Sequence, residues 1–150
     1  MKIHAWRIVR RARVDDAYTG EGARLYGGRW NSPGTAIVYA SDSLALAALE
    51  TLTSIFPRIS IDHVCFEITF DSRLVETVES VPDGWDRRPA SPLTQHIGDL
   101  WATELRTAIL SIPSILIPSQ RTYLLNPKHP DFSKITIGPM RPFPFDPRLT

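Results

Sequence analysis

Proline is the residue that most restricts how this 150-residue chain can fold. The chain contains thirteen prolines, and eight of them lie between Pro113 and Pro147. Because the proline ring fixes φ and removes a backbone donor, such a segment cannot continue a long helix. The last quarter of the chain is therefore predicted to be extended and rich in turns, with short strands at residues 114–117, 123–125 and 134–137.

Strand patterns recur in the rest of the chain. Apolar and polar residues roughly alternate over residues 3–9 and alternate regularly over 61–70, which predicts a strand at each place. Further short strands are predicted at 36–40 and 74–78. Residues 10–34 carry five glycines and no sustained period, so they are predicted to form a long ordered loop, of the kind that is often functional.

Two helices are predicted between these strands. The first covers residues 43–55, after a capping Ser41 or Asp42. The second opens at Ser91-Pro92, where a capping serine precedes a proline in the first helical position. Its apolar stripe continues as far as Ile109, which predicts an amphipathic helix packed against a sheet.

Composition and charge narrow the class of protein. Hydrophobic residues make up 43% and charged residues 22%, and the net charge of +1 gives no electrostatic reason to expect nucleic acid or a membrane. No apolar stretch is long enough for a signal peptide or for the ~20 residues of a membrane span, and the single cysteine, Cys65, fits a reducing compartment. We expect a cytoplasmic protein with one domain over residues 1–150, of the α+β class, with a mainly antiparallel sheet flanked by helices.

Glu50 is the first candidate functional residue. It lies in the segment Leu44-Ala-Leu-Ala-Ala-Leu-Glu-Thr-Leu, which is so apolar that the helix is predicted to be largely buried. A buried carboxylate requires a partner or a chemical role. The other interpretation places Glu50 on a solvated stripe of the helix, and the pattern alone favours neither.

Arg29 and Ser114 are two further candidates. The glycines around Arg29 permit unusual backbone angles and can place its guanidinium in a cleft that suits a phosphate, although a surface charge is the more common outcome. Ser114 lies in an apolar stretch, so its hydroxyl is predicted to be buried and hydrogen-bonded, most commonly to the backbone. No Gly-x-Ser-x-Gly elbow surrounds it, so serine-hydrolase chemistry is not proposed.

Other kinds of site find less support. The four histidines show no metal-ligand spacing with one another or with Cys65, so no metal site is predicted. Five arginines near the N-terminus could form a basic patch that binds RNA, but the acidic residues Asp15, Asp16 and Glu21 among them reduce its positive charge. Neither a Gly-x-Gly-x-x-Gly motif nor a P-loop is present, so a nucleotide would have to be held by other means.

A series of short motifs follows in order over nearly the whole chain. The motifs are Trp6-Arg7, Gly28-Arg29-Trp30-Asn31, Tyr39-Ala40, Leu49-Glu50, Ile97-Gly-Asp-Leu-Trp101, Pro113-Ser114, Leu125-Asn126-Pro127, His129-Pro-Asp-Phe132 and Phe145-Asp-Pro-Arg-Leu149. Their order and surroundings resemble the RES domain, a bacterial toxin family named for an arginine, a glutamate and a serine.

The resemblance implies a fold similar to that of ADP-ribosyltransferase toxins and cleavage of NAD at the nicotinamide–ribose bond. NAD is then the substrate, and no cofactor is required. An Xre-like, DNA-binding antitoxin that occludes the site and a homodimer are also expected, with no direct contact between this chain and nucleic acid or membrane. By this likeness the catalytic residues are Arg29, Glu50 and Ser114, and the residues that contact NAD are Arg7, Arg29, Tyr39 and Asn126.

The residue types suit this reaction. Loss of nicotinamide leaves an oxocarbenium-like ribose, which a carboxylate such as Glu50 stabilises. The likeness assigns Arg29 to the pyrophosphate, Tyr39 to stacking on the nicotinamide ring, and Ser114 to the nicotinamide amide or a ribose hydroxyl. Hydrolysis or phosphorolysis of NAD is the leading hypothesis. Transfer of ADP-ribose to a cellular protein is the first alternative, and an RNA-directed or non-catalytic toxin is the second.

Overall fold

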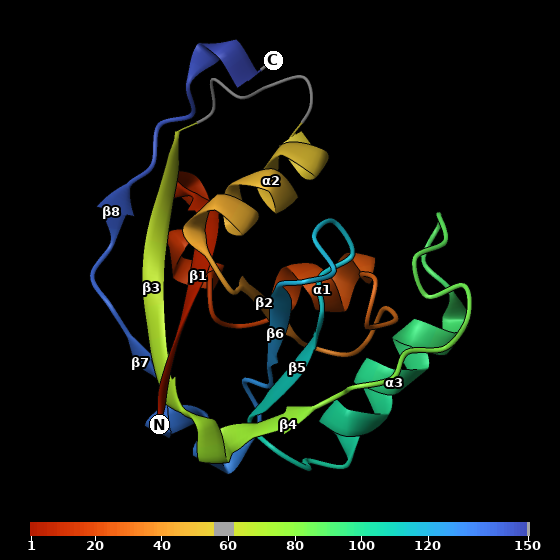
Figure 1. Ribbon diagram of the computed structural model, residues 1–150. Coiled ribbons are helices and arrows are strands. Elements are labelled where there is room, and N and C mark those ends of the chain that lie inside the picture. The colour runs from red at the N-terminus through yellow and green to blue at the C-terminus, as the bar shows by residue number, and fades with distance from the viewer. Residues whose placement is uncertain (56–61, 150) are drawn as a thin grey trace.

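The computed structural model describes residues 1–55 and 62–149 and shows a curled sheet with helices packed around it (Figure 1). Neighbouring strands follow the order β4-β5-β6-β2-β1-β3-β7, and β8 also pairs with β3. Only β4 and β5 pair in parallel among the described strands, so the predicted α+β class with a mainly antiparallel sheet is confirmed. The strands are β1 (Lys2–Arg10), β2 (Val38–Ser41), β3 (His63–Asp71), β4 (Val75–Thr77), β5 (Ile109–Pro113), β6 (Arg121–Leu125), β7 (Thr136–Ile137) and β8 (Arg141–Pro142). The α-helices are α1 (Glu21–Tyr26), α2 (Leu44–Ile55) and α3 (Pro92–Thr103).

The strands β1 and β3 are the longest and pair along their whole length, from Lys2 opposite Asp71 to Arg10 opposite His63. Their alternating sequences place Ala5 and Ile68 in the core, as the sequence predicts. Ile61, which the predicted strand included, lies outside the described residues.

Two groups of buried side chains form the core. The first joins β1, β2, β3 and β6 and includes Val38, Phe70 and Leu125. The second joins α3 to β5 and β6, and its centre is the fully buried Trp101, whose Nε1 donates a hydrogen bond to Thr107 Oγ1 at 2.9 Å. Apolar packing therefore fixes α3 to the sheet, and the hydrogen bond ties it to the segment that leads into β5.

The start of α3 is as predicted, because the Ser91 hydroxyl accepts a hydrogen bond from the Leu93 amide at 3.1 Å and caps the helix. Its end differs. The helix stops at Thr103, so the prediction that it continues along its apolar stripe as far as Ile109 is wrong. Leu105 has a left-handed backbone with φ of 52°, which turns the chain back toward the sheet, and Ile109 then begins β5.

The predicted strand at 114–117 is also wrong. The strand β5 ends at Pro113, and a turn follows, in which the Ser114 hydroxyl accepts hydrogen bonds from the Leu116 and Ile117 amides, each at 3.2 Å. These local bonds satisfy the backbone in place of a strand partner. The predicted strand at 123–125 is confirmed within β6.

The glycine-rich residues 10–34 contain more structure than a loop. A 3-10 segment, Arg11–Asp16, is followed by α1. Gly20 precedes this helix with φ of 72°, and Gly27 ends it with φ of 74°, so two of the glycines mark helix boundaries.

The helix α2 lies against β1 and β2 but is less buried than its sequence predicts. Leu46 and Ala47 are buried, whereas Leu49 is 43% exposed. Glu50 is half-buried, at the border between the packed and the exposed side of the helix.

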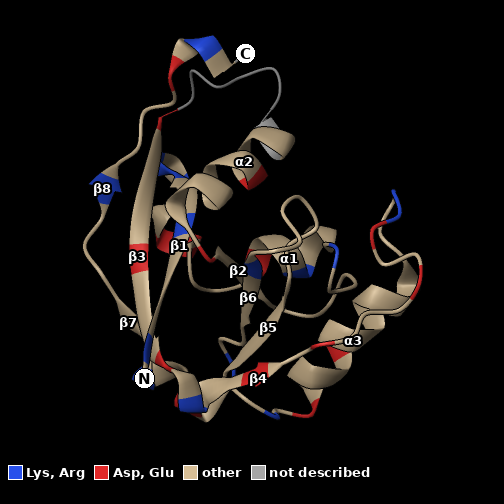
Figure 2. Cartoon of the chain, in the orientation of Figure 1, with Lys and Arg blue, Asp and Glu red and all other residues tan. Residues whose placement is uncertain are grey.

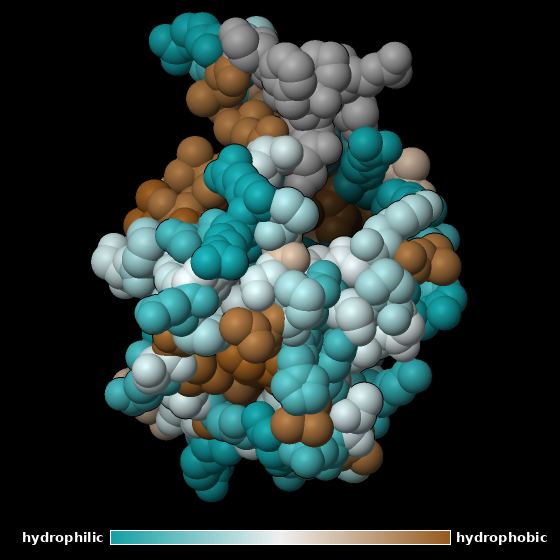
Figure 3. Space-filling view, turned by 90° about the vertical axis from the view of Figure 1, so that its right-hand side faces the viewer, coloured by the Kyte–Doolittle hydropathy of each residue, from teal (hydrophilic) through white to brown (hydrophobic). Residues whose placement is uncertain are grey.

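Charged, polar and hydrophobic residues are distributed over the surface of the molecule. Basic and acidic residues are interspersed along the chain (Figure 2). The face in Figure 3 is largely hydrophilic and is hollowed in its upper half, with hydrophobic atoms at the bottom of the hollow. Within residues 1–55 and 62–149, none of the helices has the length and hydrophobicity needed to cross a bilayer.

Candidate active site

A cleft of about 490 Å³ brings together four of the predicted site residues. Arg7 comes from β1, Arg29 from the segment before β2, Tyr39 from β2 and Glu50 from α2, and all four line the cleft. These residues are spread over the first third of the chain, and the pairing of β1 with β2 and the packing of α2 on both strands bring them together.

Glu50 supplies the carboxylate of the cleft. Burial raises the pKa of Glu50 above its usual value, and a hydrogen bond from Ser114 and the positive charge of Arg29 act against this shift. The carboxylate is thus partly desolvated, and two specific neighbours favour its ionised form against this burial.

The surroundings of Ser114 explain why its hydroxyl faces Glu50. The side chain is fully buried, and its oxygen accepts hydrogen bonds from the amides of Leu116 and Ile117. A hydroxyl has two acceptor positions and one hydrogen. Because both acceptor positions are occupied by backbone amides, the hydrogen is directed to the Glu50 carboxylate. Ser114 therefore supports the carboxylate.

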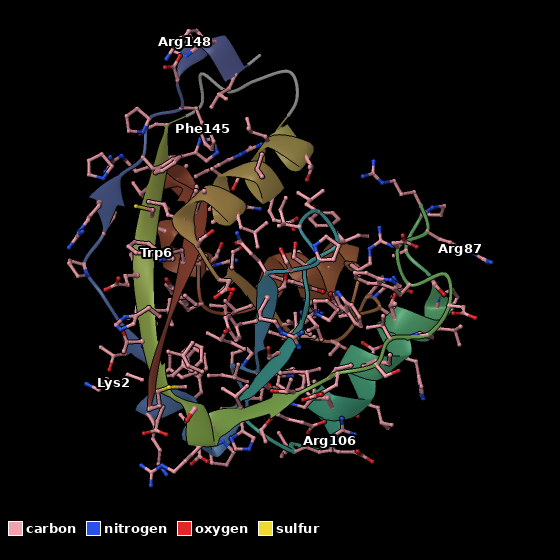
Figure 4. All side chains as sticks on the ribbon, in the orientation of Figure 1. Lys2, Trp6, Arg87, Arg106, Phe145 and Arg148 are labelled. Carbon is pink, nitrogen blue, oxygen red and sulfur yellow. The ribbon has the colours of Figure 1, made fainter. Side chains whose placement is uncertain are left out.

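Arg29 faces both Glu50 and the loop between β4 and α3. Its guanidinium donates hydrogen bonds to the carbonyls of Trp85, at 3.3 Å, and of Arg87. Arg87 contacts Arg29 through its backbone carbonyl, and its own side chain points outward from the loop (Figure 4). Burial lowers the pKa of Arg29 below its usual value, and the Glu50 carboxylate opposes this effect. The guanidinium remains a cation near neutral pH.

Tyr39 lines the cleft and also packs against the core cluster around Trp101, and its hydroxyl is engaged in hydrogen bonds. The hydroxyl donates to Asn31 Oδ1 at 2.5 Å and accepts from the Trp30 amide at 3.3 Å. Burial raises the pKa of Tyr39, which keeps the phenol neutral. Gly28 is required beside it, since a Cβ at that position would lie 2.8 Å from the Tyr39 hydroxyl.

Arg7 links the wall of the cleft to the segments around it. Its Nε donates to the Ala17 carbonyl and its Nη1 donates to the Tyr39 carbonyl, each at 2.8 Å. Burial lowers the pKa of Arg7 from its usual value. The cation is therefore both a part of the cleft lining and a brace between β1 and β2.

Asn126 does not line the cleft. Its side chain is buried at the end of β6, donates to the Ala102 carbonyl at 3.0 Å and accepts from the Lys128 amide at 3.0 Å. These contacts connect β6 with the end of α3. Among the described residues, no three His, Cys, Asp or Glu side chains come together as metal ligands.

No pattern in the sequence indicates which residues hold the segment 28–32, called here the Arg29 segment. Asn31 is fully buried and bonds to Tyr39, and Thr94, Gln95 and Asp99 of α3 bond to residues 28–32. Asn31 and Asp99 lie within the motifs that carry the family resemblance, but no local pattern indicates that these two motifs meet.

A solved structure shares this fold. The structure of the M. tuberculosis MbcT-MbcA toxin-antitoxin complex superposes with a TM-score of 0.74, covering 95% of this chain and 85% of that chain at 17% sequence identity. At this identity the likeness concerns the fold alone.

The family follows from the sequence comparisons. The model of the RES domain matches residues 4–146, and the chain therefore belongs to the RES-domain toxin family, as its motifs predict. A protein of Sphingobium sp. (strain YBL2) named Prs ADP-ribosylating toxin is 38% identical over 152 residues, covering 96% of this chain and 94% of that protein. A protein of Yersinia enterocolitica named Toxin Res is 36% identical over 149 residues, covering 96% of this chain and 97% of that protein.

Proposed function

We propose that this toxin uses NAD as its substrate and breaks the bond between nicotinamide and ribose. The observation that carries the proposal is the Glu50 carboxylate, which Ser114 supports at the wall of a cleft that Arg29 and Tyr39 also line. The name of the Sphingobium relative supports it too, because ADP-ribosylation consumes an ADP-ribose donor such as NAD.

In the proposed reaction the C1′–N bond breaks and its electron pair passes to the ring nitrogen, so nicotinamide leaves as a neutral molecule. The ribose then carries the positive charge as an oxocarbenium-like species. The ionised Glu50 stabilises this charge, and the partial burial of the carboxylate strengthens the attraction. A neutral leaving group needs little help from an acid, so one carboxylate is sufficient.

The other cleft residues bind the rest of NAD in this proposal. Arg29 and Arg7 supply positive charge for the pyrophosphate. The Tyr39 ring stacks on the nicotinamide, because its hydroxyl is engaged by Asn31. Ser114 acts through Glu50, since its own hydrogen-bonding capacity is used by that carboxylate and two backbone amides.

Water or inorganic phosphate is the acceptor that we propose for the ADP-ribose group. Attack by water on C1′ yields ADP-ribose and a proton, and attack by phosphate yields the 1-phosphate of ADP-ribose. Transfer to a cellular protein is the second candidate, which the name of the Sphingobium relative favours. We also propose that a cognate antitoxin, Xre-like by the family resemblance, covers the cleft; the toxin-antitoxin complex with the same fold supports such a partner.

Product analysis tests this function. Purified toxin, free of antitoxin, is incubated with NAD in the presence and absence of phosphate, and nicotinamide and the ADP-ribose products are separated by chromatography. We expect nicotinamide release, a product that identifies the acceptor, and a KM for NAD raised about tenfold or more in Arg29→Ala. The matched control is Arg148→Ala, which removes an exposed arginine. Intact NAD with folded wild-type protein, with or without an added acceptor protein, would contradict the proposal.

A further inference from the structure

The inner side of α3 carries polar side chains that bond to the segment holding Arg29. Thr94 Oγ1 donates to the Arg29 carbonyl at 2.7 Å, and Gln95 Nε2 donates to the Gly28 carbonyl at 3.1 Å. One turn further along, Asp99 accepts hydrogen bonds from the Ser32 amide at 3.0 Å and from the Ser32 hydroxyl. Three residues of one helix thus hold the backbone on both sides of Arg29.

The helix also touches this segment directly. A Cβ at Gly98 would lie 1.7 Å from the Trp30 carbonyl oxygen, so the backbone of α3 and the backbone of the segment are in contact. Gly98 lies between the hydrogen-bonding residues Gln95 and Asp99, and the contact fixes how far the helix stands from the segment.

On its other side the same segment is held by Asn31. The Asn31 side-chain nitrogen Nδ2 donates to the Ala23 carbonyl at 2.8 Å and to the Thr35 carbonyl at 3.1 Å, while the side-chain oxygen Oδ1 accepts from the Tyr39 hydroxyl. The backbone from Gly28 to Ser32 is therefore enclosed between α3 and the residues around Tyr39.

Thr94 is buried where α3 meets the segment that carries Arg29. Its side chain is fully buried on a helix whose inner side otherwise carries Trp101 and Ala102. A hydroxyl in such a place destabilises the fold unless it is hydrogen-bonded. Its one hydrogen has two acceptors within reach, the Arg29 carbonyl at 2.7 Å and the Ser91 carbonyl at 3.0 Å, and the shorter contact is to the residue that lines the cleft.

We propose that Thr94, Gln95 and Asp99 are positioning residues for Arg29: α3 fixes the backbone from which the guanidinium reaches the cleft and the carbonyls of Trp85 and Arg87. The inference rests on the proposed function in one respect, namely that Arg29 binds the pyrophosphate. Since the pyrophosphate does not react, Arg29 holds the ground state and the transition state equally. Loosening its backbone therefore raises KM for NAD. On the pH plateau, where the effect of the Arg29 charge on Glu50 does not alter ionisation of the carboxylate, kcat stays unchanged.

The test compares threonine variants on the same helix. Thr94→Val removes the hydroxyl at nearly constant shape, Thr94→Ser keeps it, and Thr103→Val removes an exposed threonine hydroxyl that bonds within α3. Gln95→Met is a second variant that removes one bond from a half-buried side chain and leaves the helix core intact. Thermal melting confirms that each variant is folded.

Two measurements are made on each variant. Steady-state kinetics with NAD gives KM and kcat, and amide hydrogen exchange reports the protection of Trp30 and Ser32, whose amides bond to Tyr39 and Asp99. We expect KM to rise about threefold to tenfold in Thr94→Val and in Gln95→Met, with kcat unchanged and faster exchange at both amides. Thr94→Ser restores the wild-type KM, and Thr103→Val retains it.

An unchanged KM in both variants, or a fall in kcat at constant KM, would overturn the inference. If the wild type does not cleave NAD, the proposed function fails, and hydrogen exchange then decides the positioning by itself. Faster exchange at Trp30 and Ser32 in Thr94→Val but not in Thr103→Val would support it, and equal exchange in these variants would reject it.

Discussion

Gly98 of α3 and Trp30 are in backbone contact, since a Cβ on Gly98 would lie 1.7 Å from the Trp30 carbonyl oxygen. Gly98→Ala must therefore push the helix away from the Arg29 segment. We expect the free energy of unfolding to fall by about 3 kcal/mol, with weaker NAD binding, as measured by urea denaturation and by KM.

The control for this substitution is Gly22→Ala, which also adds a methyl group inside a helix. A Cβ at Gly22 meets no atom within 4 Å, so the variant is expected to gain up to about 1 kcal/mol of stability from the helix propensity of alanine. Equal stability of the two variants would show that the close contact between α3 and Trp30 does not exist.

Ser114→Ala tests the link between Ser114 and Glu50. The Ser114 hydroxyl bonds to the ionised carboxylate and so opposes the rise that burial causes in the pKa of Glu50. Without this hydroxyl the pKa of Glu50 rises further. Because the proposed reaction requires the ionised carboxylate, we expect the acid limb of the kcat/KM profile to move to higher pH in Ser114→Ala.

The matched control is Ser119→Ala, an exposed serine close to the same turn, which is expected to keep the wild-type profile. An acid limb of Ser114→Ala that stays in place, or moves to lower pH, would refute the support of Glu50 by Ser114.

Glu50→Gln tests the cost of the buried carboxylate to stability. The folded-state pKa of Glu50 lies above its usual value, so the unfolded chain loses this proton at a lower pH than the folded chain does. Stability from this group therefore falls as pH rises from the usual carboxyl pKa through the folded-state pKa. Glu50→Gln should be more stable than wild type near neutral pH and should lose the advantage in acid. Urea denaturation at several pH values measures this, and a variant less stable than wild type at neutral pH would contradict it.

Tyr39→Phe separates the ring from the hydroxyl. The variant loses the hydroxyl bonded to Asn31 and Trp30, so the free energy of unfolding is expected to fall by about 1 to 3 kcal/mol. The aromatic ring, which we propose to stack on nicotinamide, remains. KM for NAD should therefore change less in Tyr39→Phe than in Tyr39→Leu, and an equal increase in both variants would contradict a stacking role.

The long strands were predictable because their alternation directly reflects burial on one face, as at Ala5 and Ile68. The border between α3 and β5 was not, because apolar residues continue from the helix into the strand and do not mark where the chain turns. The left-handed backbone of Leu105 makes that turn, and leucine is a residue that rarely adopts it.

The candidate site was predictable where a residue conflicts with its local surroundings. Glu50 in an apolar helix and Arg29 among glycines both meet this condition, and both line the cleft. The bonds of Thr94 and Asp99 to the Arg29 segment join residues 65 and 67 positions apart, so no local pattern records them. The support of Glu50 by Ser114 is likewise a tertiary contact, which the predicted strand at 114–117 did not include.

The most direct test of the proposed activity is the rate of nicotinamide release from NAD by wild type and by Glu50→Gln, with the exposed Glu79→Gln as the matched control. We predict release by wild type and Glu79→Gln, and a rate at least about 100-fold lower in folded Glu50→Gln. A Glu50→Gln protein that releases nicotinamide at the wild-type rate would contradict the role of this carboxylate and, with it, the proposed mechanism.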